Sequence, residues 1–133
     1  TEHSDTEFDF FLPPYSILFW DKVIREGRTE AVFAAIRQAR QTLLQYDNVK
    51  FYGYLMDPEI VTNLDNYCDY IHHSGGVCRE ILAMLQREEG RLTEENLEET
   101  LANWREFVVH YDYDQFWDER FWIQWNAEHA AAP

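Results

Sequence analysis

Apolar residues recur every three or four positions through most of the chain, which is the spacing of helices that bury one face. The clearest stripe consists of Leu97, Leu101, Trp104 and Val108. Capping and turn residues divide the pattern into segments, because prolines, glycines and short polar residues stand at their boundaries. These segments predict helices over 17–26, 30–46, 57–73, 77–89, 93–110 and 115–128.

One further segment is better suited to a strand. The sequence VKFYGYL at 49–55 is rich in β-branched and aromatic residues and follows a turn at Asp47 and Asn48. A strand needs a partner, and either 8–12 or 107–113 can supply one. We therefore predict a mainly α domain of five to six helices with a small β element, with an α+β fold as the alternative.

Two of the predicted helices begin at aspartates that can cap them. Asp57 precedes Pro58, which suits the first position of a helix over 57–73. Asp114 can cap the last helix, over 115–128. Both aspartates can accept hydrogen bonds from the first free amides of the helix that follows.

The composition fits one globular domain spanning 1–133. Apolar types make up 46% of the 133 residues and aromatic types 17%, which suffices for a core without disulfides. We expect the ends, 1–7 and 127–133, to be loose. Cys68 and Cys78 make no disulfide framework, and no apolar run approaches the ~20 residues that span a membrane. These features predict a soluble protein of a reducing compartment, the cytoplasm.

The charge is large, negative and unevenly distributed. The formal net charge is −14, from 25 acidic residues against 11 Lys and Arg. The stretch 88–119 holds 11 acidic residues against only Arg91 and Arg105, whereas 22–50 is locally basic. So few basic residues argue against direct contact with nucleic acid or anionic lipid. This uneven charge permits a homodimer in which the acidic region of one copy meets the basic region of the other.

The predicted helix over 93–110 carries much of this charge. Its glutamates off the apolar stripe are Glu94, Glu95, Glu98, Glu99 and Glu106. Several stand four residues apart and repel one another, by a few tenths of a kcal/mol per pair. Three interpretations are open: a solvated face, a face that binds a partner's cations, or a face that meets the chain's own 22–50 region.

The segment DYDQFWDERFWIQW, 112–125, places aromatic rings among acids. A helix there can bury some of these rings in the core, and the others would lie at the surface beside carboxylates. Exposed aromatics rimmed by charge are typical of protein interfaces. The candidate partner-binding residues in this segment are Asp112, Asp114, Phe116, Asp118, Glu119 and Trp122.

The acidic and aromatic surface predicts a protein that acts by binding rather than by catalysis. Its partner would be a basic protein, and basic surfaces of this kind are common in nucleic-acid-binding proteins and nuclease complexes. We therefore predict an inhibitor of the immunity, anti-defence or nucleic-acid-mimic type. The step from an acidic binding protein to an inhibitor of this type is an association from size and charge.

An alternative is a small enzyme with Cys78 as its nucleophile. The sequence Ser74-Gly75-Gly76 leads into a helix start, where a thiol in the first turn is activated. His72 or His73 would then serve as the base. No catalytic or cofactor motif is present, and we predict no bound cofactor.

A metal-binding protein is the second alternative. A zinc site would use Cys68, His72, His73 and Cys78, with Cys68 and His72 one helical turn apart. A weak calcium site would use the carboxylates of Asp112, Asp114, Asp118 and Glu119. Neither spacing matches an established ligand pattern, so we predict no metal site.

Overall fold

The computed structural model describes residues 5–118 and 123 of the chain. The described elements, in chain order, are β1 (Phe8–Phe11), α1 (Ile17–Arg25), α2 (Thr29–Leu43), β2 (Val49–Tyr52), α3 (Pro58–Val61), α4 (Gly75–Gln86) and α5 (Leu97–His110). Short 3-10 turns lie at Tyr54–Met56, Leu64–Asn66 and Asp114–Phe116. The predicted mainly α fold with a small β element is confirmed. No helix within the described part has the length and apolar content needed to cross a membrane.

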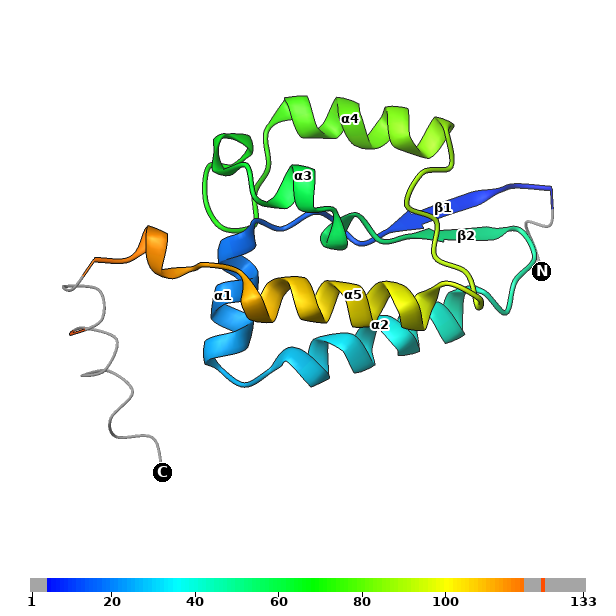
Figure 1. Cartoon of the computed structure of the whole chain (residues 1–133). Coiled ribbons are helices and arrows are strands. Elements are labelled where there is room, and N and C mark those ends of the chain that lie inside the picture. Colours follow the sequence, from blue (N-terminus) through cyan, green and yellow to red (C-terminus); the bar gives the residue numbers. More distant parts are fainter. Residues whose placement is uncertain (1–4, 119–122, 124–133) are drawn as a thin grey trace.

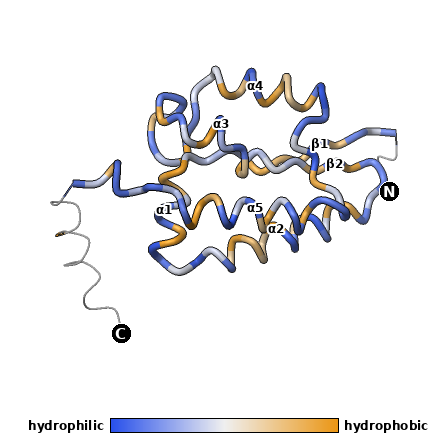
Figure 2. Tube along the Cα trace, viewed as in Figure 1, coloured by the Kyte–Doolittle hydropathy of each residue, from blue (hydrophilic) through white to orange (hydrophobic). Residues whose placement is uncertain are grey.

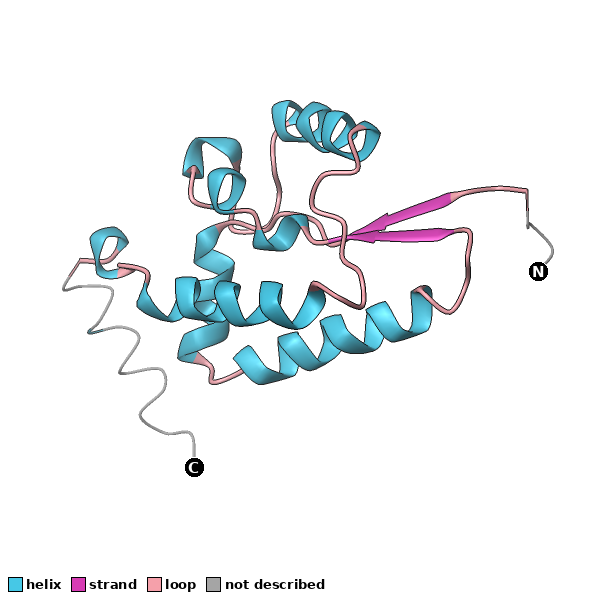
Figure 3. Cartoon of the chain, turned by 45° about the vertical axis from the view of Figure 1, so that its right-hand side comes forward, coloured by secondary structure: helices cyan, strands magenta, loops and turns pink. Residues whose placement is uncertain are grey.

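The elements form three layers, with the two strands in the middle. In Figures 1 and 3, α4 lies on one side of the strands, and α2 and α5 lie on the other. Adjacent residues of β2 point to opposite faces of the sheet. Accordingly, Phe51 packs in the cluster of α1, α2 and α5, and Tyr52 in the cluster of α3 and α4. Strands covered on both faces are typical of α/β layer structures.

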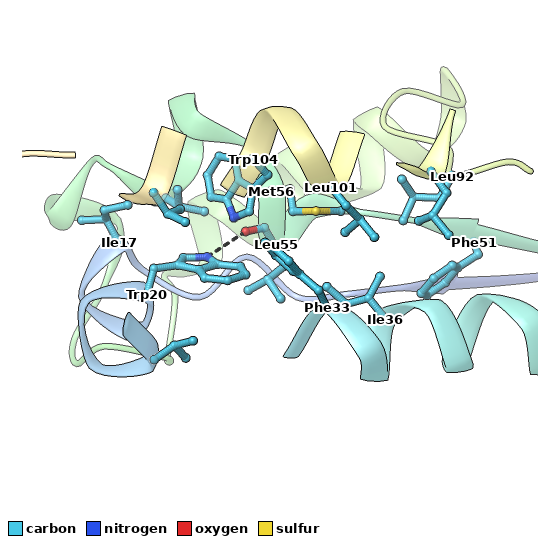
Figure 4. Packing of buried hydrophobic residues seen from close by; sticks show 14 of the residues in the cluster. Ile17, Trp20, Phe33, Ile36, Phe51, Leu55, Met56, Leu92, Leu101 and Trp104 are labelled. Carbon is cyan, nitrogen blue, oxygen red and sulfur yellow. Dashed lines mark hydrogen bonds between the residues drawn. The ribbon is translucent and has the colours of Figure 1, made fainter. Parts of the chain in front are cut away.

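The larger core centres on Trp20. Its ring is fully buried, and its indole N–H donates to the Leu55 carbonyl at 3.3 Å (Figure 4). The rings of Phe33 and Trp104 each lie 5.8 Å from it, centroid to centroid. Figure 2 shows hydrophobic positions recurring among hydrophilic ones along α2 and α5. Those positions face this core, as the sequence periodicity predicts.

The partner of β2 is the aromatic segment near the N-terminus. β1 and β2 run parallel, with Phe8 opposite Val49 and Phe11 opposite Tyr52. The parallel direction requires a long crossover, which α1 and α2 provide. The other candidate, 107–113, is wrong, because most of it belongs to α5 and the turn that follows.

The helix predicted over 57–73 is wrong beyond its first turn. Asp57 caps α3 as expected, since its carboxylate accepts the amides of Glu59 and Ile60. The helix ends at Val61, and the Asn63 side chain then accepts the amide of Asp65. Short polar side chains of this type compete with the backbone for hydrogen bonds and end helices.

The helix predicted over 115–128 is wrong at its start. Asp114 begins a 3-10 turn instead of capping a helix, and Trp117 continues in extended conformation. Most of the range 115–128 lies outside the described residues. The strand predicted over 49–55 ends at Tyr52, because Tyr54–Met56 forms a 3-10 turn.

Candidate functional site

The loop between α3 and α4, residues 62–74, holds a carboxylate against an imidazole. Oδ2 of Asp69 lies 2.6 Å from Nδ1 of His72. Oδ1 of the same carboxylate accepts the backbone amides of Ile71 at 2.8 Å and His72 at 2.7 Å. One carboxylate therefore fixes the loop backbone with one oxygen and the imidazole with the other.

These hydrogen bonds favour the ionised carboxylate. The His72 amide contributes most, followed by the Ile71 amide and the imidazole, and together they lower the pKa of Asp69 to about 2. An unperturbed Asp is about half protonated near pH 4. Asp69 stays ionised there, so its contacts persist until the pH falls toward the lowered value.

The loop lies beyond the carboxyl ends of both strands. The hydroxyl of Tyr67 donates to the Pro14 carbonyl at 2.9 Å. The amide and hydroxyl of Ser16 both donate to the Tyr70 carbonyl. Pro14 and Ser16 follow directly on β1, and the strands point toward this side of the molecule (Figure 1). In open α/β sheets, this edge is where ligands bind.

A groove of about 500 Å³ opens beside Asp69, and His72 does not contribute to its lining. Asp69 contributes to its lining, together with apolar and aromatic groups of Leu18, Leu64, Tyr67, Tyr70 and Trp117. Lys22 and Arg25 complete the wall on the α1 side. A concave, mainly apolar surface with a few polar groups is typical of small-molecule sites.

The second histidine faces a thiol. Sγ of Cys78, in the first turns of α4, lies 3.7 Å from Nδ1 of His73. The sequence left His72 and His73 as equal candidates for the base beside Cys78. In the structure the two histidines have different neighbours. His73 lies beside the thiol, whereas His72 is held by Asp69.

The predicted helical spacing of Cys68 and His72 is wrong, because both lie in the loop. Cys68 Sγ contacts the His72 carbonyl instead, at 3.3 Å. Among residues 5–118 and 123, no group of three or more His, Cys, Asp or Glu side chains is arranged to hold a metal ion.

The acidic helix α5 meets the chain's own basic helix α2. Arg37 forms a two-bonded ion pair with Glu98, each bond 2.8 Å long. Arg40 lies 3.5 Å from Glu94. Part of the predicted partner-binding charge is therefore met by the 22–50 region, which was one of the three interpretations.

The remaining acidic candidates lie at the surface. Glu95, Glu99, Glu106, Asp112, Asp114 and Asp118 are exposed. Glu106 is 3.2 Å from the His110 ring, whereas Glu95 and Glu99 have no ion pair within the described part of the chain. Their role in binding a partner stays a prediction.

The aromatic candidates turn toward the core where the structure describes them. Phe116 is half-buried and stacks on Tyr111 at 6.3 Å between ring centroids. The indole N–H of Trp117 donates to the Asp21 carboxylate at 2.8 Å. Glu119 and Trp122 lie outside the described residues.

Asp69 is the residue that sequence reasoning missed. Its signal is the spacing of three residues to His72, in a stretch rich in Asn and Asp. An Asp in a turn accepts the amides two and three residues ahead, and this brings the side chain at the third position toward it. The helix assigned to 57–73 concealed this turn.

Searches against protein-family models, curated protein sequences and solved structures found no match to this chain.

Proposed function

We propose that the 62–74 loop forms part of a hydrolytic active site, in which His72, oriented by Asp69, acts as the general base. The observation that supports this is the double use of the Asp69 carboxylate, on the backbone amides and on His72 Nδ1. A base whose orientation is fixed by a third group is the arrangement on which hydrolytic triads depend.

The chemistry follows from which ring nitrogen carries the proton. A carboxylate beside Nδ1 favours the tautomer with a proton on that atom, which leaves the lone pair on Nε2. Nε2 takes a proton from a water molecule or hydroxyl group as its oxygen attacks an ester-type substrate. The imidazolium then returns that proton to the leaving oxygen, while Asp69 stabilises the positive ring.

The second histidine pair is less complete. His73 and Cys78 have the nucleophile and base of the alternative enzyme, with Nδ1 and Sγ 3.7 Å apart. Within the described residues, no carboxylate contacts the His73 ring. Of these two histidines, only His72 has an orienting carboxylate within the described residues.

Hydrolysis of 4-nitrophenyl acetate tests this function. We expect His72→Ala to lower kcat/KM by about 100-fold, because the general base is lost. The exposed ring packs against little, so the thermal midpoint should not change. His73→Ala and Cys78→Ser are the matched controls and should retain the wild-type rate. Equal rates for the wild type and His72→Ala, or loss of activity in either control, would contradict the proposal.

A second candidate is the acidic binding surface, and the exposed charge of Glu95 and Glu99 favours it. Glu95 and Glu99 are exposed at the start of α5, and Asp112 and Asp114 are exposed after its end. Exposed carboxylates of this kind attract basic proteins. An inhibitor of a nucleic-acid-handling protein remains the proposed form of that function, with the cytoplasm as its predicted location.

This candidate predicts binding that weakens with salt. We expect a tagged protein to retain a basic protein from nuclease-treated lysate at low salt and release it at high salt. Replacing Glu95 and Glu99 by Gln should weaken the retention, whereas Glu59→Gln with Asp65→Asn, the same charge change near α3, should not. Equal retention by both double variants would exclude these glutamates as the contact.

A further inference from the structure

The groove beside Asp69 has walls from three separate segments of the chain. Leu18 belongs to α1, Leu64 and Tyr67 to the 62–74 loop, and Trp117 to the segment that follows α5. These segments lie at the same end of the molecule in Figure 1. A groove assembled from distant parts of the sequence depends on the whole fold and is not a local irregularity of one loop.

Long-range hydrogen bonds hold the aromatic walls in place. The Tyr67 hydroxyl donates to the Pro14 carbonyl at 2.9 Å, and the Trp117 indole N–H donates to the Asp21 carboxylate at 2.8 Å. These bonds join residues that are 53 and 96 positions apart in the sequence. A ligand that enters between walls already fixed in this way loses little free energy to ordering them.

The charged groups of the lining already have partners within the protein. The Asp21 carboxylate lies 2.6 Å from the Arg25 guanidinium. Asp69 accepts two backbone amides of its own loop. The Lys22 ammonium lies over the ring of Tyr70, 5.5 Å from its centre. A charged ligand group gains little beside groups that are paired, so the groove favours uncharged, apolar ligand groups.

The size of the groove also bears on what fills it. Pockets of roughly 300–1,000 Å³ bury most of a drug-sized ligand, and this groove has about 500 Å³. An acetyl group would occupy only a small part of that space. Because the gain from burial grows with the apolar area removed from water, a longer apolar group binds more strongly here.

We propose that this groove receives the acyl group of the ester that His72 hydrolyses, so that the substrates are esters with an extended apolar acyl chain. The inference rests on the proposed function of His72. Asp69 connects the two parts, because its carboxylate contributes to the lining of the groove and contacts the imidazole. With the chain in the groove, the ester carbonyl lies at the rim, beside the water molecule that Nε2 activates.

The exposure of the imidazole indicates which half of the ester enters the groove. The His72 side chain is 70% exposed and lies outside the lining. The leaving alcohol takes its proton from Nε2, so it departs on this open side. The acyl half is then the part that lies in the groove, and it leaves as the free acid after hydrolysis.

A series of 4-nitrophenyl esters tests the substrate class, because the leaving group is constant along it. We expect kcat/KM to be about 100-fold higher for the hexanoate than for the acetate, since burying each of four additional CH₂ groups contributes about threefold. Leu18→Trp should lower this ratio below about tenfold, because the larger side chain fills part of the groove. Leu82→Trp, the same substitution at an exposed position of α4, should keep the ratio.

Alkylation of Cys68 measures occupancy of the groove without hydrolysis. Cys68 is exposed and contributes to the lining, and it is the only cysteine left in Cys78→Ser. In that variant, N-(4-nitrophenyl)hexanamide, the amide analogue of the hexanoate ester, should slow the reaction of Cys68 with iodoacetamide by at least about fivefold at saturation. N-(4-nitrophenyl)acetamide at the same concentration should leave the reaction rate unchanged.

The outcomes separate this inference from the proposed base. Equal kcat/KM for the acetate and the hexanoate, with hydrolysis that depends on His72, would overturn the acyl groove and leave the base in place. Equal alkylation of Cys68 with and without the hexanamide would overturn it as well. Hydrolysis that is unchanged in His72→Ala, with Cys68 protected by the hexanamide, would contradict the base and support the binding of apolar chains in the groove.

Discussion

Trp20→Ala should lower the free energy of unfolding by about 3–5 kcal/mol, the range for removing a fully buried large aromatic side chain. Trp20 lies on α1, packs against α2 and α5, and contacts the rings of Phe33 and Trp104. Its loss leaves a cavity among rigid neighbours and leaves the Leu55 carbonyl without its indole donor. The effect is therefore expected to be among the largest for a single residue.

Urea denaturation followed by circular dichroism measures this change. Leu82→Ala on α4 is the control, because Leu82 is exposed and its truncation should alter the free energy of unfolding by less than about 0.5 kcal/mol. A loss below about 1.5 kcal/mol for Trp20→Ala would mean that the core is not packed around this ring.

Asp21→Asn should lower the free energy of unfolding by about 3 kcal/mol, through loss of a buried charge contact. Asp21 is only 4% exposed and lies 2.6 Å from the Arg25 guanidinium. It also accepts the Trp117 indole N–H, across 96 residues of sequence. The amide keeps the shape of the side chain and can still accept that bond, but it carries no charge to balance Arg25.

The same denaturation experiment checks this prediction. Glu26→Gln is the matched control just after α1, since Glu26 pairs with Arg28 at the surface, where ion pairs contribute little. We expect its effect to stay below about 1 kcal/mol. Equal effects of the two substitutions would show that the burial of Asp21 does not strengthen its ion pair.

The sequence periodicity predicted the helices that bury one long face. Leu97, Leu101, Trp104 and Val108 are all buried on α5, because helical spacing alone places them on one side. The start of this helix was predicted at Thr93, four residues before its first residue, Leu97. Thr93 and Asn96 each accept the other's backbone amide, and α5 begins at the next residue.

The candidate site was harder to predict from the sequence, because short-range polar contacts determine the conformation of its backbone. The apolar positions of 57–73 fit a helix, yet Asn63 and Asp69 bind backbone amides that a helix would use. Strand pairing was equally hidden, since Phe8 and Val49 are brought together by the intervening helices. Periodicity contains no information about contacts over such distances.

The most direct test of the proposed base is the rate of 4-nitrophenyl acetate hydrolysis by Asp69→Asn, measured across pH. The amide can still accept the loop amides, but it presents a donor to His72 Nδ1 and so favours the tautomer with a protonated Nε2, which cannot accept a proton. We predict that kcat falls by at least about 100-fold at all pH values while the fold is retained. A variant that hydrolyses the ester at the wild-type rate, with the wild-type pH profile, would contradict the role of Asp69 and His72.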